Sequence, residues 1–387
     1  MQLRNFIRRH KWRLRPLKRF VLPIRNAKRG IVRLFRNVPT IEQSTRNYRG
    51  LSSSEVTEIF PAVRVQSVPN PVRPNEALVD LRAEPALLYH LRNIDFWARY
   101  GGSIVTRDNK LLADLSPEVW GVENQPRFSQ LRLPKPRMLS GKTAIAVTPE
   151  APGNYYHWLI DLVPRVALVQ VGRLDFDRLL INGSRDGYES ASLTALKIPR
   201  EKILYVDAGD RFAIDDAVIP SMDHSNKAIA PWKIEMLRSL HDAVSSNRSS
   251  SSGRLYISRR GAAVRRVINE SEFEPLLRDA NFSIVQLESM PWSEQVASFG
   301  AAKVVLAPHG AALANIAFCA PDTLVAEIGT QDGYKDFYLQ LANAARLRYR
   351  FVEAQPRVTG GTNSFRAVEA EDMLADLAAI RKFLGDL

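Results

Sequence analysis

The stretch Asn154-Tyr-Tyr-His-Trp-Leu-Ile-Asp-Leu-Val-Pro-Arg165 is the part of the chain that says most about its fold. Read as a helix, it places Asn154, His157, Asp161 and Arg165 within about 80° of arc, with apolar side chains around the rest. A helix of this kind is normally buried. Its imidazole, carboxylate and guanidinium groups must then pair with one another or face a cleft. The stripe therefore predicts either an internal packing network or a functional surface.

The charge of the chain is concentrated at one end. Residues 1–36 contain thirteen Lys or Arg and no acidic residue. The other 41 basic residues equal the 41 acidic residues in number, so the net charge of +13 belongs to this tail. A nucleic-acid-binding domain is expected to carry its basic surface on the fold. We therefore exclude nucleic acid as a partner.

The segment 1–50 is predicted to be a basic tail that lies on a membrane surface. Residues 29–36 mix bulky apolar with basic side chains, which suits a helix on anionic lipid. The alternative is a solvated tail. No run of 18 apolar residues occurs, and the apolar residues 20–24 are too short for a signal-peptide core. With one cysteine, Cys319, no intramolecular disulfide forms. We expect a cytoplasmic protein, peripheral on the inner face of the membrane.

Two α/β domains are predicted, 51–244 and 254–387, joined by the serine-rich linker 245–253. Alternating strands and helices favour Rossmann-like parallel sheets covered on both faces, with a cleft between the domains. The expected strands are a hairpin at 103–114 and the runs 144–147, 178–181, 203–206, 217–219, 255–258, 282–287, 303–307, 323–328 and 348–352. The expected helices are 154–165, 188–197, 231–245, 270–280, 291–299, 333–344 and 369–384.

Two local signals refine these helices. Pro164 removes a backbone donor, which predicts a kink or a helix end one turn after Asp161. Asn269 and Glu272 have the spacing of a capping box at the start of the helix 270–280.

Three predicted strands of the second domain end in polar residues suited to a nucleotide. Arg259 and Arg260 could hold a diphosphate, or could form a solvated or acid-paired turn. The turn at His309-Gly310 offers backbone N–H groups to an anion, unless the imidazole is a core or capping group. Glu327 could bind the hydroxyls of a ribose, or could be an ordinary strand residue.

Five blocks of the sequence together resemble glycosyltransferase family 61, a group that includes bacterial capsular polysaccharide biosynthesis proteins. The resemblance covers about 140–330. It implies a GT-B fold with two Rossmann-like domains, the donor bound mainly by the second, and an inverting, metal-independent transfer from a nucleotide sugar. The blocks are Asn154–Arg165, Tyr256–Arg260, Arg265–Glu270, Glu294-Gln295, and Pro308–Asn315 followed by Glu327-Ile328. The substrate-binding residues that we predict are Asn154, Arg165, Arg259, Arg260, Glu270, His309, Gly310, Ala311, Asn315 and Glu327.

An inverting transfer needs a base for the acceptor hydroxyl and positive groups for the departing diphosphate. His157 or Asp161 is the predicted base, and the residues leave that choice open. The predicted function is transfer of a sugar from a nucleotide-sugar donor to a glycan or lipid-linked glycan acceptor, in capsular, extracellular or lipopolysaccharide biosynthesis, with no cofactor and no metal site. The alternative is a non-catalytic nucleotide-sugar-binding assembly protein.

Deleting residues 1–45 should release the protein from anionic vesicles, because the deletion removes all thirteen basic residues of the tail. Binding of the full chain should fall with added salt, since screening sets in beyond roughly 8 Å at physiological ionic strength. Co-sedimentation with vesicles of anionic and of neutral lipid measures both effects. Unchanged binding after the deletion would contradict a membrane role for the tail.

Overall fold

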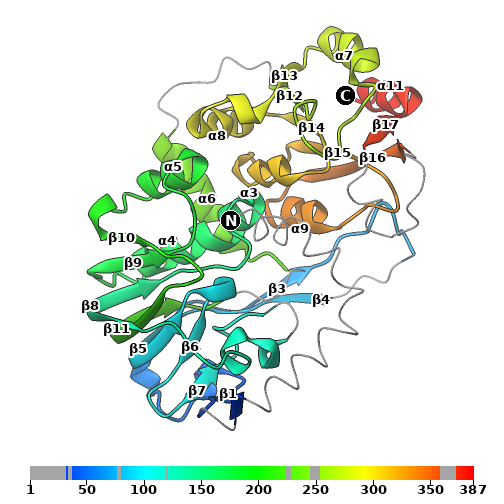
Figure 1. Cartoon of the computed structure of the whole chain (residues 1–387). Coiled ribbons are helices and arrows are strands. Elements are labelled where there is room, and N and C mark those ends of the chain that lie inside the picture. The colour runs from blue at the N-terminus through cyan, green and yellow to red at the C-terminus, as the bar shows by residue number, and fades with distance from the viewer. Residues whose placement is uncertain are drawn as a thin grey trace.

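A computed structural model describes residues 32–33, 37–75, 80–118, 121–222, 228–244, 253–357 and 372–387 (Figure 1). Nearly all of the basic tail, and the predicted linker apart from Gly253, lie outside these residues. Two sheets with helices between them make up the described part. The chain is thus a mixed α/β protein, as the alternating pattern predicted. Within the described residues, no helix has the length and apolarity needed to cross a membrane.

The larger sheet is built by the first half of the chain. Its strand order is β1-β7-β6-β5-β11-β8-β9-β10, with β2 paired to β5. The neighbours β11, β8, β9 and β10 pair parallel, as do β1 and β7, whereas β5 and β6 pair antiparallel with their neighbours. The bounds are β1 Thr40–Glu42, β2 Val56–Phe60, β5 Ala86–Trp97, β6 Ser103–Val105, β7 Lys110–Leu112, β8 Arg137–Ile145, β9 Arg178–Ile181, β10 Ile203–Tyr205 and β11 Arg211–Pro220.

The second sheet is parallel except at one edge. Its order is β13-β12-β14-β15-β16-β17, and β17 pairs antiparallel with β16. The prediction of one helix over 369–384 was wrong at its start, because residues 373–375 add this edge strand. The bounds are β12 Arg254–Ile257, β13 Ser283–Val285, β14 Val304–Pro308, β15 Leu324–Gly329, β16 Arg348–Pro356 and β17 Met373–Ala375.

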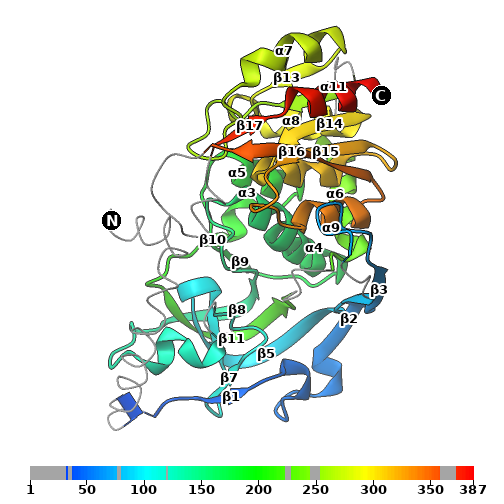
Figure 2. The same cartoon turned by 90° about the vertical axis from the view of Figure 1, so that its right-hand side faces the viewer.

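Helices fill the space between the two sheets (Figure 2). On the far face of the second sheet, α7 and α11 cover a further apolar cluster. The far face of the first sheet is covered by strand and loop residues such as Tyr48 and Leu51, so the expectation of helices on both faces was wrong there. The bounds are α3 Tyr155–His157, α4 Val163–Val171, α5 Gly187–Ala195, α6 Pro231–Val244, α7 Glu270–Asp279, α8 Trp292–Ala301, η10 Ala311–Phe318, α9 Phe337–Ala344 and α11 Leu377–Gly385.

One apolar core runs from the first half of the chain into the second. Trp158 and Leu162 of the first half belong to the same buried cluster as Phe299 and Leu313 of the second. Burial of apolar surface is the main driving force of association. The halves are therefore held together by a shared core beneath the polar residues at their junction.

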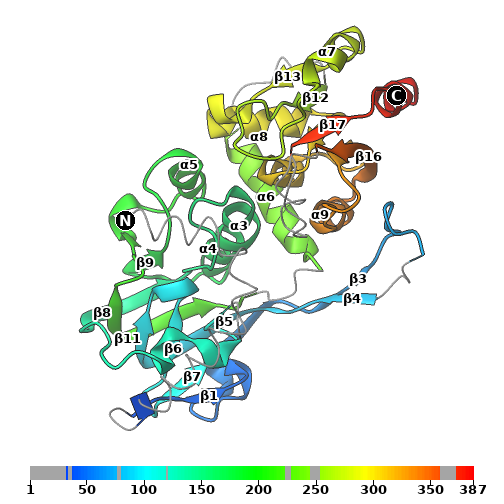
Figure 3. The same cartoon turned by 45° about the vertical axis from the view of Figure 1, so that its right-hand side comes forward.

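A two-stranded ribbon also reaches from the first half to the second. It consists of β3 (Val63–Gln66) and β4 (Asp80–Ala83), paired antiparallel, and leaves the first sheet as an extended arm (Figure 3). Asn343 of α9 donates through Nδ2 to the carbonyl of Gln66 at 2.8 Å. This arm ties the two halves together at a second place.

The predicted capping box at Asn269 does not form. The Asn269 side chain donates to the carbonyl of Ala375 at 3.0 Å and accepts from its N–H at 2.9 Å. The Asn269 side chain therefore makes the two hydrogen bonds with β17 that the backbone of a neighbouring strand would make. The backbone carbonyl of Asn269 accepts instead from the N–H of Glu272 at 3.0 Å. A contact more than a hundred residues away thus overrides the local motif.

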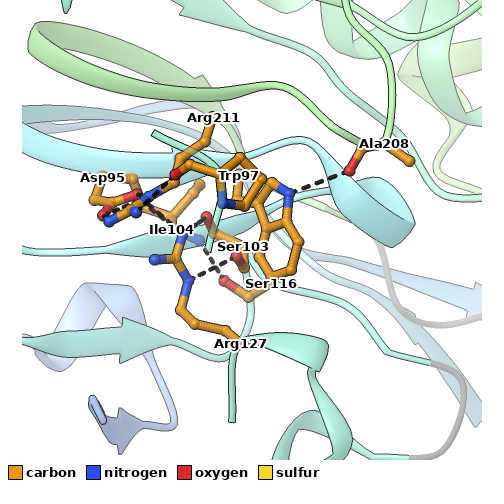
Figure 4. A network of polar contacts seen from close by, with 9 residues as sticks. Asp95, Trp97, Ser103, Ile104, Ser116, Arg127, Ala208 and Arg211 are labelled. Carbon is orange, nitrogen blue, oxygen red and sulfur yellow. Dashed lines mark hydrogen bonds and ion pairs between the residues drawn. The ribbon is translucent and has the colours of Figure 1, made fainter. Parts of the chain in front are cut away.

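Two arginines share one carboxylate inside the first sheet (Figure 4). Arg211 donates through Nε to Asp95 Oδ1 at 2.9 Å, and Arg127 donates through Nη2 to the same oxygen at 3.1 Å. Arg127 is buried and also donates to Ser103 Oγ at 3.0 Å. Burial raises the pKa of Asp95, but the Arg211 hydrogen bond and the Arg127 charge outweigh it and hold that pKa below its usual range.

Asp95→Asn should lower the free energy of unfolding by about 3–5 kcal/mol, the cost of leaving a buried charge without its partner. The stabilisation from Asp95 should be present above its unfolded pKa of about 3.9 and be lost as the pH falls through the lower folded value. Denaturant unfolding from pH 7 to pH 3 measures both. Glu58→Gln is the control, because its pair with Arg46 is exposed and 4.0 Å long, worth at most about 1 kcal/mol. Equal losses in the two variants would contradict the prediction.

Candidate active site at the junction of the two halves

The helix that follows β8 is irregular at the residues singled out by the sequence. Asn154 caps α3, accepting from the N–H of Tyr156 at 3.2 Å. A wider π-helical turn, Trp158–Leu162, then leads into α4. Pro164 explains this turn, since it has no N–H to bond to the carbonyl four residues earlier. The predicted irregularity at Pro164 is thus present as a π turn, a feature frequent at functional sites.

His157 lies between two carboxylates. Its Nδ1 is 2.7 Å from Asp161 Oδ2, and its Nε2 is 3.3 Å from Glu150 Oε2. Burial lowers the pKa of His157, but the hydrogen bonds to Asp161 and Glu150 outweigh it and raise that pKa to about 9. The ring is therefore an imidazolium at neutral pH.

Arg165, the fourth residue of the stripe, points into the protein. Its Nη1 donates to the carbonyl of Val147 and to Thr148 Oγ1, both at 2.8 Å, and its Nη2 donates to the carbonyl of Pro220 at 3.0 Å. Burial lowers the pKa of Arg165 to about 9. Arg165 therefore links the ends of β8 and β11 through its hydrogen bonds, and it lies behind His157 and Asp161.

The consecutive arginines after β12 have different surroundings. Arg260 is half exposed and pairs with Glu270 at 2.9 Å and with Glu274 at 2.7 Å. Glu270 is buried and also accepts from Ser258 Oγ at 2.8 Å. Arg260 is therefore paired with two carboxylates of α7, which is the acid-paired alternative for this turn.

Arg259 instead lies against the turn before η10. A side chain at Gly310 would collide with its guanidinium, so the glycine is what admits the arginine there. Arg259 Nη2 donates to the carbonyl of Val264 at 3.1 Å. Burial and the charge of Arg265 together lower the pKa of Arg259. Among the described residues, the buried Nε atoms of Arg259 and Arg265 meet no hydrogen-bond partner.

His309 is oriented from behind by a buried carboxylate. Its Nδ1 is hydrogen bonded to Glu327 Oε1, and Glu327 Oε2 accepts from the hydroxyl of Tyr349 at 2.6 Å. Glu327 is fully buried, so both of its oxygens are used inside the protein. That geometry favours a role for Glu327 in orienting the His309 imidazole. It does not favour the ribose contact that the sequence led us to expect for Glu327.

Aromatic rings connect the two histidines across the junction. His157 contacts Tyr156 at 5.5 Å between ring centroids, Tyr156 contacts Tyr338 at 5.9 Å, and Tyr338 contacts His309 at 5.2 Å. The separate sequence motifs around His157 and His309 therefore form one site. The tyrosines were missed because ring contacts between distant segments leave no local pattern.

Asn315 makes a hydrogen bond between the two halves of the chain. Its side chain accepts from the hydroxyl of Tyr155, which in turn accepts from Trp292 Nε1 at 3.0 Å. Asn315 is fully buried in η10, the short helix that Ala311 begins. The structure thus places Asn315 and the Asn154 cap at the base of the site rather than at its surface.

Within the described ranges, no three His, Cys, Asp or Glu side chains are grouped as a metal-ligand set. Asp177, a residue of the Asp-x-Asp sequence at 175–177, instead accepts from the backbone N–H of Lys142 at 2.7 Å. This carboxylate belongs to the turn that leads into β9.

The comparison with known families covers these same elements. Residues 155–326 match the family model described as Glycosyltransferase 61. No curated protein matches the chain. The matched segment runs from the helix of His157 through Arg259 to the His309 turn, which confirms the resemblance inferred from the motifs. Over this segment the chain is similar to glycosyltransferase family 61, a resemblance that points to a glycosyltransferase.

Proposed function

We propose that the protein moves a sugar from a nucleotide-sugar donor to a hydroxyl of a glycan or lipid-linked glycan, with inversion at the anomeric carbon and without a metal ion. The product belongs to a capsular, extracellular or lipopolysaccharide glycan. The two halves act as in a GT-B enzyme, with the donor on 254–387 and the acceptor on 51–244. The reaction is cytoplasmic, and the tail 1–36 holds the enzyme at the inner face of the membrane.

The half-buried arginines Arg259 and Arg265 are the observation that carries this proposal. The charge of Arg265 lowers the pKa of Arg259, and the buried Nε atoms of both residues have no hydrogen-bond partner inside the described structure, which suits a doubly charged ligand. A nucleotide diphosphate supplies that charge, and it gains more negative charge as the sugar leaves. Gly310 and His309 form the neighbouring wall, so the donor diphosphate is proposed to bind here.

His157 and Asp161 support the acceptor side of the proposal. They stand in the first half, joined to His309 through the rings of Tyr156 and Tyr338. An incoming hydroxyl must lose its proton as it attacks the anomeric carbon. A charged imidazole held by carboxylates at this position can organise that proton transfer.

Arg259→Ala should weaken binding of a nucleoside diphosphate by about 1.5–3 kcal/mol, the range for a hydrogen bond to a charged group. Calorimetry with UDP and GDP measures the change. Arg260→Ala is the matched control, because the adjacent arginine is paired with Glu270 and Glu274 and should leave affinity unchanged. The opposite ranking of the two variants would contradict the assignment.

Loss of turnover in EDTA, restored by manganese, would contradict metal independence.

His157→Ala and Asp161→Asn should stay folded at the assay temperature and keep nucleoside diphosphate affinity, yet lose turnover by about 10²–10⁴-fold, the size of the proton-transfer contribution that these residues organise. Release of nucleoside diphosphate from a panel of UDP- and GDP-sugars gives the rate, and differential scanning fluorimetry gives the melting temperature. Loss of donor binding together with folding would show that the pair is structural. A wild type that binds donors but never cleaves them would favour the assembly-protein alternative.

The pH dependence of stability checks the state of His157 independently. Its folded pKa of about 9 lies above the unfolded value, which is about 6.5. Its contribution to stability should therefore be complete below about pH 6.5 and be lost as the pH rises through 9. The melting temperature of the wild type should fall over this interval relative to His157→Ala. Parallel profiles would mean that the imidazole is not held in its charged form.

A further inference from the structure

Glu150 stands out in the loop between β8 and α3, although no sequence motif pointed to it. Its backbone φ is 63°, in the left-handed region that residues with a Cβ seldom occupy. The carboxylate lies just past the carboxyl end of a parallel strand, the edge of an α/β sheet at which ligands bind. Strained backbone of this kind often accompanies function.

The neighbours of Glu150 prevent the loop from relaxing. Thr148 donates its N–H to Asn182 Oδ1 at 2.8 Å and accepts from Asn182 Nδ2 at 2.7 Å. Pro149 packs against Gly101, where an added Cβ would overlap the proline ring. Ala151 is fully buried. The Glu150 backbone is therefore fixed on both sides, and its carboxylate is presented beside His157.

The imidazole between Glu150 and Asp161 cannot itself accept a proton. A carboxylate oxygen faces each ring nitrogen, at 2.7 Å and 3.3 Å. Carboxylates only accept hydrogen bonds, so both nitrogens must carry hydrogen for both contacts to be favourable. The raised pKa of His157 agrees with that geometry. The acceptor proton must then go to a carboxylate.

Of the two carboxylates, Glu150 is the one that an acceptor can reach. Its side chain is 47% exposed against 32% for Asp161, and it is the more distant of the two from the ring. Asp161 lies on the π turn, and its charge interacts with that of the buried Arg165. Asp161 is therefore suited to hold His157, and Glu150 to meet a substrate.

We propose that Glu150 is the catalytic base of the sugar transfer, with His157 and Asp161 as positioning residues that hold its side chain. The inference rests on the proposed function. In the step, the acceptor O–H gives its proton to a Glu150 oxygen, and the acceptor oxygen bonds to the anomeric carbon. The bond from that carbon to the diphosphate oxygen breaks, and its electron pair leaves with the diphosphate. Glu150 then returns the proton to water.

Glu150→Gln should lower the release of nucleoside diphosphate from UDP- and GDP-sugars, with water as acceptor, by about 10²–10⁴-fold. Affinity for UDP or GDP and the melting temperature should stay at wild-type values, since Glu150 belongs to the other half from Arg259. In Glu150→Ala, added sodium formate should restore part of the rate, because a small carboxylate can take the place of the lost one. Glu201→Gln, an exposed carboxylate in the turn before β10, is the matched control.

Wild-type turnover in Glu150→Gln would overturn the assignment while leaving the proposed function in place. So would a joint loss of rate and melting temperature with no recovery of Glu150→Ala in formate, because that pattern belongs to a structural anchor. A wild type that neither binds UDP and GDP nor cleaves any sugar of the panel would overturn the proposed function, and the role of Glu150 with it.

Discussion

The buried guanidinium of Arg165 is the contact on which the site in the first half depends. It binds the backbone just after β8 and at the end of β11, and it extends from the helix that carries His157 and Asp161. A buried arginine needs all its donors satisfied, because an unpaired buried charge is very costly. Satisfying them fixes the loop that presents Glu150 against the helix that presents the imidazole. One residue thus sets the distance between groups from two elements.

The shared core gives the same rigidity to the junction between the halves. Trp158 packs in one cluster with Phe299 and Leu313, and Tyr155 hydrogen bonds with Asn315 above it. Close-packed interiors transmit small displacements rather than absorb them. The ring contacts from His157 to His309 therefore lie on a rigidly packed core. In the proposed reaction, this core holds the acceptor and donor groups in fixed positions relative to each other.

Local patterns predicted most of the elements but not the partners of the site residues. Apolar periodicity located the helix of His157 and the strand before Arg259, because burial imposes those periods on the sequence. Arg259 and Arg260 differ because a glycine lies against the first and a glutamate against the second, each at least ten residues away in the sequence. Glu150 left only a weak signal, a carboxylate in the loop after a strand. Apart from the predicted hairpin at 103–114, the antiparallel part of the first sheet was missed because strand alternation alone does not reveal direction.

Opposite charges on opposite sides of the junction explain why the proposed reaction needs both halves. A base loses proton affinity beside a cation, whereas a departing diphosphate requires cations. Glu270 illustrates the conflict, because the positive charge of Arg260 lies against this carboxylate of the second half. In the first half, Glu150 and Asp161 face the imidazolium of His157, and the charge of Arg165 interacts with Asp161. Separating that cluster from Arg259 and Arg265 lets the acceptor lose a proton on one side of the sugar while negative charge leaves on the other.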